Sequence, residues 1–105
     1  MQFYCKSIYM AKSLYIISYD LKVSGRDYSS LYDAIKTFEW QHPLESTWLI
    51  KTDSSADEIS KLLREDGRMD ASDLLFVCKL DPKDRQGWLD KSVWEWIRNF
   101  ISEQS

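Results

Sequence analysis

The sequence predicts an α+β fold, with an antiparallel sheet, two helices on one face of it and a further helix at the C-terminal end. Three observations lead to this prediction. The chain has 105 residues, which suits one domain. Short apolar runs typical of strands alternate with segments whose apolar residues recur at helical spacing. There are only three glycines and two prolines, too few for a turn-rich all-β sandwich.

The first strand is predicted at Ser13–Asp20, SLYIISYD, because this run is short and rich in tyrosine and isoleucine. Alternation places Leu14, Ile16 and Ser18 on one face of the strand. After a loop over Leu21–Arg26, Asp27 is expected to cap a helix of about twelve residues. The apolar stripe of this helix consists of Tyr28, Leu31, Tyr32, Ile35 and Phe38.

The middle of the chain leaves one alternative open. Pro43 pushes His42 out of helical geometry and breaks the helical pattern. Leu44–Thr52 then reads as extended chain that forms either one long strand or two short ones. Ser55 and Glu58 match a capping box that opens a second helix, and Gly67 is a plausible stop for it. The buried stripe of this helix consists of Ile59, Leu62 and Leu63.

The last elements are a strand at Ser72–Leu80 and a C-terminal helix capped by Asp90. Residues 1–12 are expected to be an N-terminal extension, and residues 13–105 a single domain with a tail from about residue 86. In the strand, Leu74, Phe76, Cys78 and Leu80 share one face. The apolar positions of the helix are Val93, Trp96, Ile97 and Phe100.

This order of elements fits a ferredoxin-like βαββαβ sandwich. The two most apolar strands, Leu14–Tyr19 and Leu74–Leu80, are expected to lie side by side in the centre of the sheet. The second sheet face has no helix in the first 80 residues to cover it, so self-association is expected. The residues expected to pack together on the helix-covered face are Leu31, Ile35, Ile59, Leu62 and Leu63.

Composition excludes several classes of protein. The 44% apolar and 30% charged residues fit a globular chain. The 14 basic and 17 acidic residues give a net charge of −3 without any basic run, so the electrostatic pattern of a strong nucleic-acid binder is absent. No signal peptide or membrane-spanning run is visible.

The cysteines and the histidine bear on redox state and metal binding. A single histidine, His42, and the lack of a C-x-x-C pair exclude a zinc site within one chain. Two isolated cysteines, Cys5 and Cys78, indicate a reducing, cytoplasmic location. Because Cys78 sits in an apolar run, it is expected to be buried.

Several of these segments resemble a known family, the small CRISPR-associated adaptation subunit, and more closely its stand-alone SinR-like and VapD-like relatives. The resemblance rests on the strand that ends in Tyr19-Asp20, on Ser46-Thr47-Trp48, on the strand LLFVCKL and on the tail Gly87-Trp88-Leu89…Trp94-Glu95-Trp96-Ile97. It implies a ferredoxin-like homodimer. It also implies that Asp20 matches the family's metal-binding aspartate, one from each subunit, which holds Mg²⁺ near the two-fold axis.

Each candidate site residue also has a simpler structural role. Asp20 is either a metal ligand and catalytic residue or a strand-end aspartate that turns the chain. Lys22, Arg26 and Ser46 are candidate substrate-binding residues that would contact phosphate, or ordinary solvent-facing residues. His42 is either a general base or a surface turn residue. The tryptophans, which could stack on nucleobases, are expected instead in the core or a dimer interface.

The sequence therefore favours a cytoplasmic homodimer that is a candidate Mg²⁺-dependent nuclease or phosphodiesterase with Asp20 as the metal ligand. The alternative is a non-catalytic protein-interaction or regulatory module with the same fold, such as an antitoxin-like or phage-encoded factor. The acidic charge favours the alternative, whereas the strand-ending Asp20 with Arg26 nearby favours the enzyme.

Overall fold

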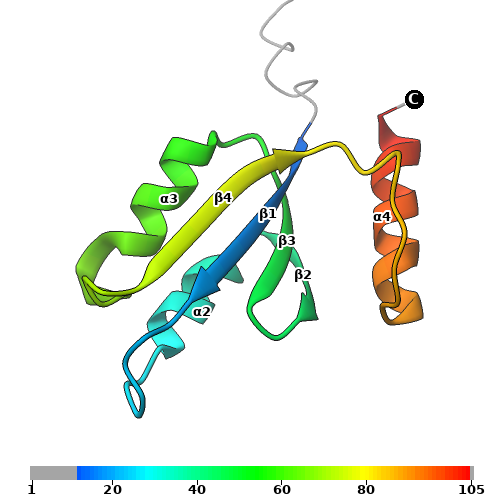
Figure 1. Ribbon diagram of the computed structural model, residues 1–105. Coiled ribbons are helices and arrows are strands. Elements are labelled where there is room, and N and C mark those ends of the chain that lie inside the picture. Colours follow the sequence, from blue (N-terminus) through cyan, green and yellow to red (C-terminus); the bar gives the residue numbers. More distant parts are fainter. Residues whose placement is uncertain (1–11, 105) are drawn as a thin grey trace, which may run out of the picture.

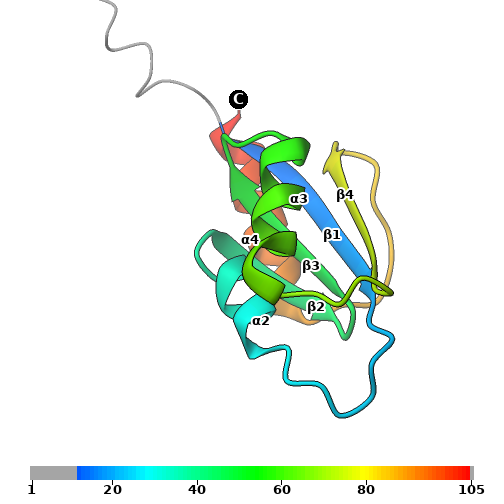
Figure 2. The ribbon, with the colours of Figure 1, turned by 90° about the vertical axis from the view of Figure 1, so that its left-hand side faces the viewer.

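The computed structural model describes residues 12–104. Within these residues four strands form one antiparallel sheet in the order β2-β3-β1-β4: β1 (Ser13–Asp20), β2 (Glu39–Leu44), β3 (Thr47–Thr52) and β4 (Leu74–Leu80). Helices α2 (Ser29–Ile35) and α3 (Ala56–Arg64) lie on one face of the sheet, and α4 (Lys91–Glu103) lies on the other (Figures 1 and 2). A short 3-10 turn, η1 (Glu65–Gly67), follows α3. The predicted α+β class is confirmed.

The face under α2 and α3 carries the larger core. Alternation along β1 turns Tyr15, Ile17 and Tyr19 toward these helices. The apolar stripes predicted for the two helices meet them there, although Leu62 is only partly buried. The fully buried side chains that the helices supply are Leu31, Ile35, Ile59 and Leu63.

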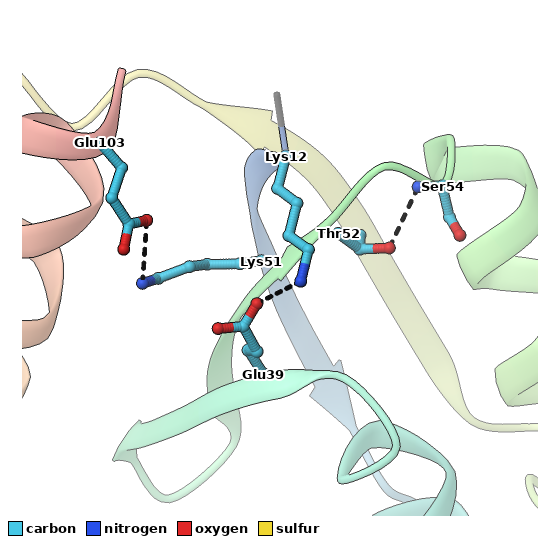
Figure 3. Close-up of polar contacts among 6 residues, drawn as sticks. All are labelled: Lys12, Glu39, Lys51, Thr52, Ser54 and Glu103. Atoms are coloured by element: carbon cyan, nitrogen blue, oxygen red, sulfur yellow. Dashed lines mark hydrogen bonds and ion pairs between the residues drawn. The ribbon is translucent and has the colours of Figure 1, made fainter. Parts of the chain in front are cut away.

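Helix α4 covers part of the second face, which the sequence left uncovered in the first 80 residues. Val93, Ile97 and Phe100 of α4 pack against Leu14 and Leu49 of the central strands. Next to this cluster the buried Lys51 side chain extends from β3 toward α4 (Figure 3). Its Nζ lies 3.7 Å from the carboxylate of Glu103 and 4.6 Å from the centre of the Trp96 ring. The helix is thus held by apolar packing and by one cation that contacts both a ring and an acid.

The α2 region is shorter than predicted, and a hairpin follows it. Helix α2 has seven residues, and its N-cap is Tyr28 and not the predicted Asp27, whose carboxylate accepts a hydrogen bond from the Ser29 N–H at 2.9 Å. The segment Leu44–Thr52 holds one strand and not two, because β3 (Thr47–Thr52) lies within it. Strand β2 comes before it and ends at Leu44. Since β2 is an edge strand, it tolerates Pro43, which cannot donate to the ladder.

Strand β4 lies at the edge of the sheet, so the prediction that it is central was wrong. It does pair with β1, from Leu14 opposite Leu80 to Asp20 opposite Leu74. The central strands are β1 and β3. The prediction that Cys78 is buried was also wrong: the α4 cluster reaches β4 at Leu80, and Cys78 is exposed. The predicted N-terminal extension and Cys5 lie outside the described residues, apart from Lys12, whose ammonium pairs with Glu39 (Figure 3).

Candidate functional site

Asp20 is the last residue of β1 and belongs to the face of the sheet that α4 covers only in part. Its side chain is 62% exposed, and its carboxylate lies 2.8 Å from the ammonium of Lys22. A shallow hollow of about 250 Å³ opens beside it, lined by Ser18, Tyr19, Asp20, Leu74, Leu75 and Phe76. Asp20 is therefore an accessible carboxylate that already has a cation as its partner.

An apolar stripe borders this hollow. We call Leu74, Phe76 and Cys78 the β4 stripe, because alternation places all three on one face of that edge strand. Leu74 and Phe76 are 58% and 61% exposed. In the register with β1, Leu74 lies opposite Asp20 and Phe76 lies opposite Ser18. The predicted site residue thus adjoins an uncovered apolar surface.

The predicted substrate-binding residues do not all gather around Asp20. Lys22 contacts it directly. Ser46 lies in the β2–β3 turn at the same end of the sheet, where its carbonyl accepts a hydrogen bond from the Tyr19 N–H at 3.1 Å. Arg26 is held elsewhere, since its guanidinium donates to the carbonyl of Gly67 and lies 5.3 Å from the centre of the Tyr28 ring.

The loop that carries Lys22 is anchored by Asp73, a residue that sequence reasoning missed. The buried Asp73 carboxylate accepts hydrogen bonds from the Lys22 N–H at 2.7 Å and from the Tyr28 hydroxyl at 3.0 Å. It also accepts one from the Asp70 N–H at 2.8 Å. Burial alone raises the pKa of Asp73, but these donors outweigh burial and hold the pKa below its usual value.

The residues around Asp20 do not by themselves make a metal site in one subunit. Between Lys12 and Gln104 no group of three or more His, Cys, Asp or Glu side chains converges as metal ligands would. The carboxylate of Asp20 is also paired with an ammonium. Mg²⁺ binds through as few as one or two carboxylates with water. The fit therefore depends on a second Asp20 from another copy of the chain.

A second hollow, of about 270 Å³, opens on the helix-covered face at the same end of β1. Trp48 forms its floor and is 2% exposed, as expected for a core tryptophan. His42, which was expected in a surface turn, lies in β2 with its ring stacked on Trp48. Alternation within Glu39–Leu44 would have revealed that Trp40 and His42 share a face, had that segment been recognised as a strand.

Comparison of this chain with family models, with characterised proteins and with solved structures finds no significant match. None of the helices within residues 12–104 has the length and apolar character needed to span a membrane.

Proposed function

We propose that this protein is a homodimeric interaction module built from ferredoxin-like subunits that associate through the β4 stripe. The observation that carries the proposal is the exposure of Leu74 and Phe76 on an edge strand. Apolar side chains grouped on an exposed surface mark candidate interaction sites. The element order β-α-β-β-α-β and the strand order β2-β3-β1-β4 support the ferredoxin-like assignment.

The two edges of the sheet differ in a way that supports β4 as the associating strand. The edge strand β2 carries Pro43 and the charged Glu39, features that discourage strand pairing. Strand β4 has seven residues, LLFVCKL, with one lysine and no proline. Its single charged residue, Lys79, gives this longer apolar edge less protection against association than Pro43 and Glu39 give β2. A second copy packed on the β4 stripe would bury both the exposed side chains and this edge.

We expect the protein to have twice the 12.5 kDa mass of one chain in light scattering at micromolar concentration. Phe76→Glu should return it to the monomer mass, because a charge at the centre of the interface would be buried without a partner. Leu44→Glu is the matched control, since Leu44 is 55% exposed but belongs to the opposite edge strand. The interface is refuted if the wild type is a monomer, or if Phe76→Glu and Leu44→Glu both reduce the mass to that of the monomer.

Asp20 supports a second candidate function, a Mg²⁺-dependent nuclease or phosphodiesterase. Asp20 and Phe76 belong to the same sheet face, and Asp20 lies opposite Leu74. A dimer packed through that face would bring two Asp20 carboxylates toward the two-fold axis. Like charges that approach closely repel each other unless a cation lies between them. Mg²⁺ would supply that cation, and it would activate water or neutralise charge on a phosphate.

Melting curves with and without Mg²⁺ test the second candidate. We expect Mg²⁺ to raise the melting temperature of the wild type, because a ligand that binds only the folded dimer stabilises it. Asp20→Asn should abolish this effect, whereas Lys22→Gln should retain or enlarge it, since Lys22 competes for the carboxylate. Cleavage of RNA or DNA should need both Mg²⁺ and Asp20. Identical wild-type curves would exclude the metal site and leave the dimer proposal standing.

A further inference from the structure

The hollow on the helix-covered face lies apart from Asp20 and the β4 stripe. Tyr19 and Asp20 are neighbours in β1, so their side chains point to opposite faces of the sheet. The hollow has a volume of about 270 Å³ and is lined by Tyr19, Tyr32, Lys36, His42, Glu45 and Trp48. Four of these six residues have aromatic rings, and the other two carry opposite charges.

The floor of the hollow is a fixed stack of flat rings. The His42 and Trp48 ring centres lie 3.7 Å apart, with 9° between their planes. The Trp48 indole N–H donates to the Tyr19 hydroxyl at 2.9 Å, and Tyr32 stacks at 6.2 Å from Trp48. His42 is an exposed residue. Because Trp48 occupies one face of the imidazole, a further flat ring would stack on its other face.

Charged groups stand at the rim of this stack. The Lys36 ammonium lies 5.3 Å from the centre of the Trp40 ring, and Trp40 is 39% exposed. Glu45 follows β2 in the hairpin turn, and its backbone carbonyl oxygen lies 2.9 Å from His42 Nε2. Lys36 offers hydrogen-bond donors and the Glu45 carboxylate offers only acceptors. A ligand that suits both carries hydrogen-bond donors for Glu45 and an acceptor for Lys36.

We propose that this hollow binds the base of a free purine nucleoside or nucleotide, stacked on the other face of His42, with guanine preferred. Guanine presents two N–H donors that a carboxylate such as Glu45 accepts, next to a carbonyl that an ammonium such as Lys36 contacts. Stacking on aromatic side chains supplies sequence-independent affinity. The net charge of −3 and the lack of a basic run in the sequence favour a single nucleotide over a nucleic-acid strand.

Calorimetric titration of the full chain tests this site. Guanosine and guanosine monophosphate should bind with similar affinity, adenosine should bind more weakly, and inorganic phosphate should give no heat. His42→Ala should weaken guanosine binding about tenfold, while His42→Phe should retain it, because the stacking surface remains. Glu45→Gln should reduce the preference for guanosine over adenosine. Melting curves establish that each variant is folded.

Three results would overturn the proposal. One is the lack of saturable binding by any nucleoside, and another is unchanged binding by His42→Ala. The third is tighter binding of an oligonucleotide than of guanosine, which would indicate a strand as the ligand. Phe76→Glu should bind guanosine like the wild type, so loss of the proposed dimer and loss of this site are separate outcomes.

Discussion

At the scale of single residues, Asp73 joins segments that are far apart in the sequence. Its bond to the Lys22 N–H spans 51 positions, and it also binds the Tyr28 hydroxyl from the same region. It therefore fixes the loop that brings Lys22 to Asp20. The sequence placed Asp73 inside the strand predicted at Ser72–Leu80, whereas β4 begins at Leu74. Its anchoring role could not be predicted, because the identity of its three donors depends on tertiary structure.

Replacing Asp73 should destabilise the fold markedly. Asp73→Ala leaves three donors without their acceptor, and we expect the free energy of unfolding to fall by about 2–4 kcal/mol. Asp73→Asn should cost less, because one oxygen remains. Asp84→Ala, in an exposed loop, is the control. Urea denaturation followed by circular dichroism measures all three, and a loss for Asp73→Ala no larger than that of the control would contradict the anchoring role.

Asp20 shows how far sequence reasoning reaches at this scale. Its place at the end of β1 and its proximity to Lys22 follow from the strand pattern and the short loop. The hydrogen bond from Arg26 to the Gly67 carbonyl could not be predicted, because it depends on the path of the connection between α3 and β4. The stack of His42 on Trp48 likewise depends on the pairing of β2 with β3.

At the scale of elements, local signals correctly predicted β1 and the start of α3, but they did not reveal β2 or the position of β4 within the sheet. Strand β1 has the predicted bounds, and the capping box of Ser55 and Glu58 opens α3 as predicted. The β4 sequence has apolar residues on both faces, which is typical of a central strand. Its edge position follows from the strand order, and strand order is set by long-range pairing that the pattern of one segment does not encode.

Two neighbouring leucines of α3 test its orientation. Leu63 is fully buried, whereas Leu62 is only partly buried. We expect Leu63→Ala to lower the free energy of unfolding by about 2–5 kcal/mol, as truncations of buried leucines do. Leu62→Ala should cost clearly less, although the sequence placed both residues in the buried stripe. Chemical denaturation of both variants measures the difference, and equal losses would mean that the helix is rotated.

At the scale of the whole molecule, the two faces of the sheet are covered unequally. Helices α2 and α3 cover one face, whereas α4 covers the other face only in part and leaves the β4 stripe exposed (Figure 2). The expectation of an uncovered face came from the absence of a helix in the first 80 residues. It holds only for the β4 side, because Val93, Ile97 and Phe100 place α4 over Leu14 and Leu49. The remaining apolar surface lies beside Asp20 and supports the proposed association there.

The stability of the whole molecule should fall at acidic pH, because several carboxyl groups have a lowered pKa in the folded state. Side-chain contact with Lys12 lowers the pKa of Glu39, and the hydrogen bonds that Asp73 accepts outweigh its burial and lower its pKa. Hydrogen bonds from Ser29 lower the pKa of Asp27, and those from Ser72 lower the pKa of Asp70. A carboxyl whose pKa is lower in the folded state stabilises the fold above its unfolded pKa of about 4. That contribution is lost as the pH falls toward the folded pKa.

At alkaline pH the folding stability should fall as the pH rises. Burial raises the pKa of Tyr19 in the folded state. A raised pKa stabilises the fold below the unfolded value of about 10 and is lost as the pH rises further. We therefore expect the urea midpoint to be level between about pH 6 and 9 and to fall on both sides. Asp73→Asn should flatten the acid limb and Tyr19→Phe the alkaline limb. A wild-type midpoint that stays constant from pH 6 down to about pH 3 would contradict the assigned carboxyl shifts.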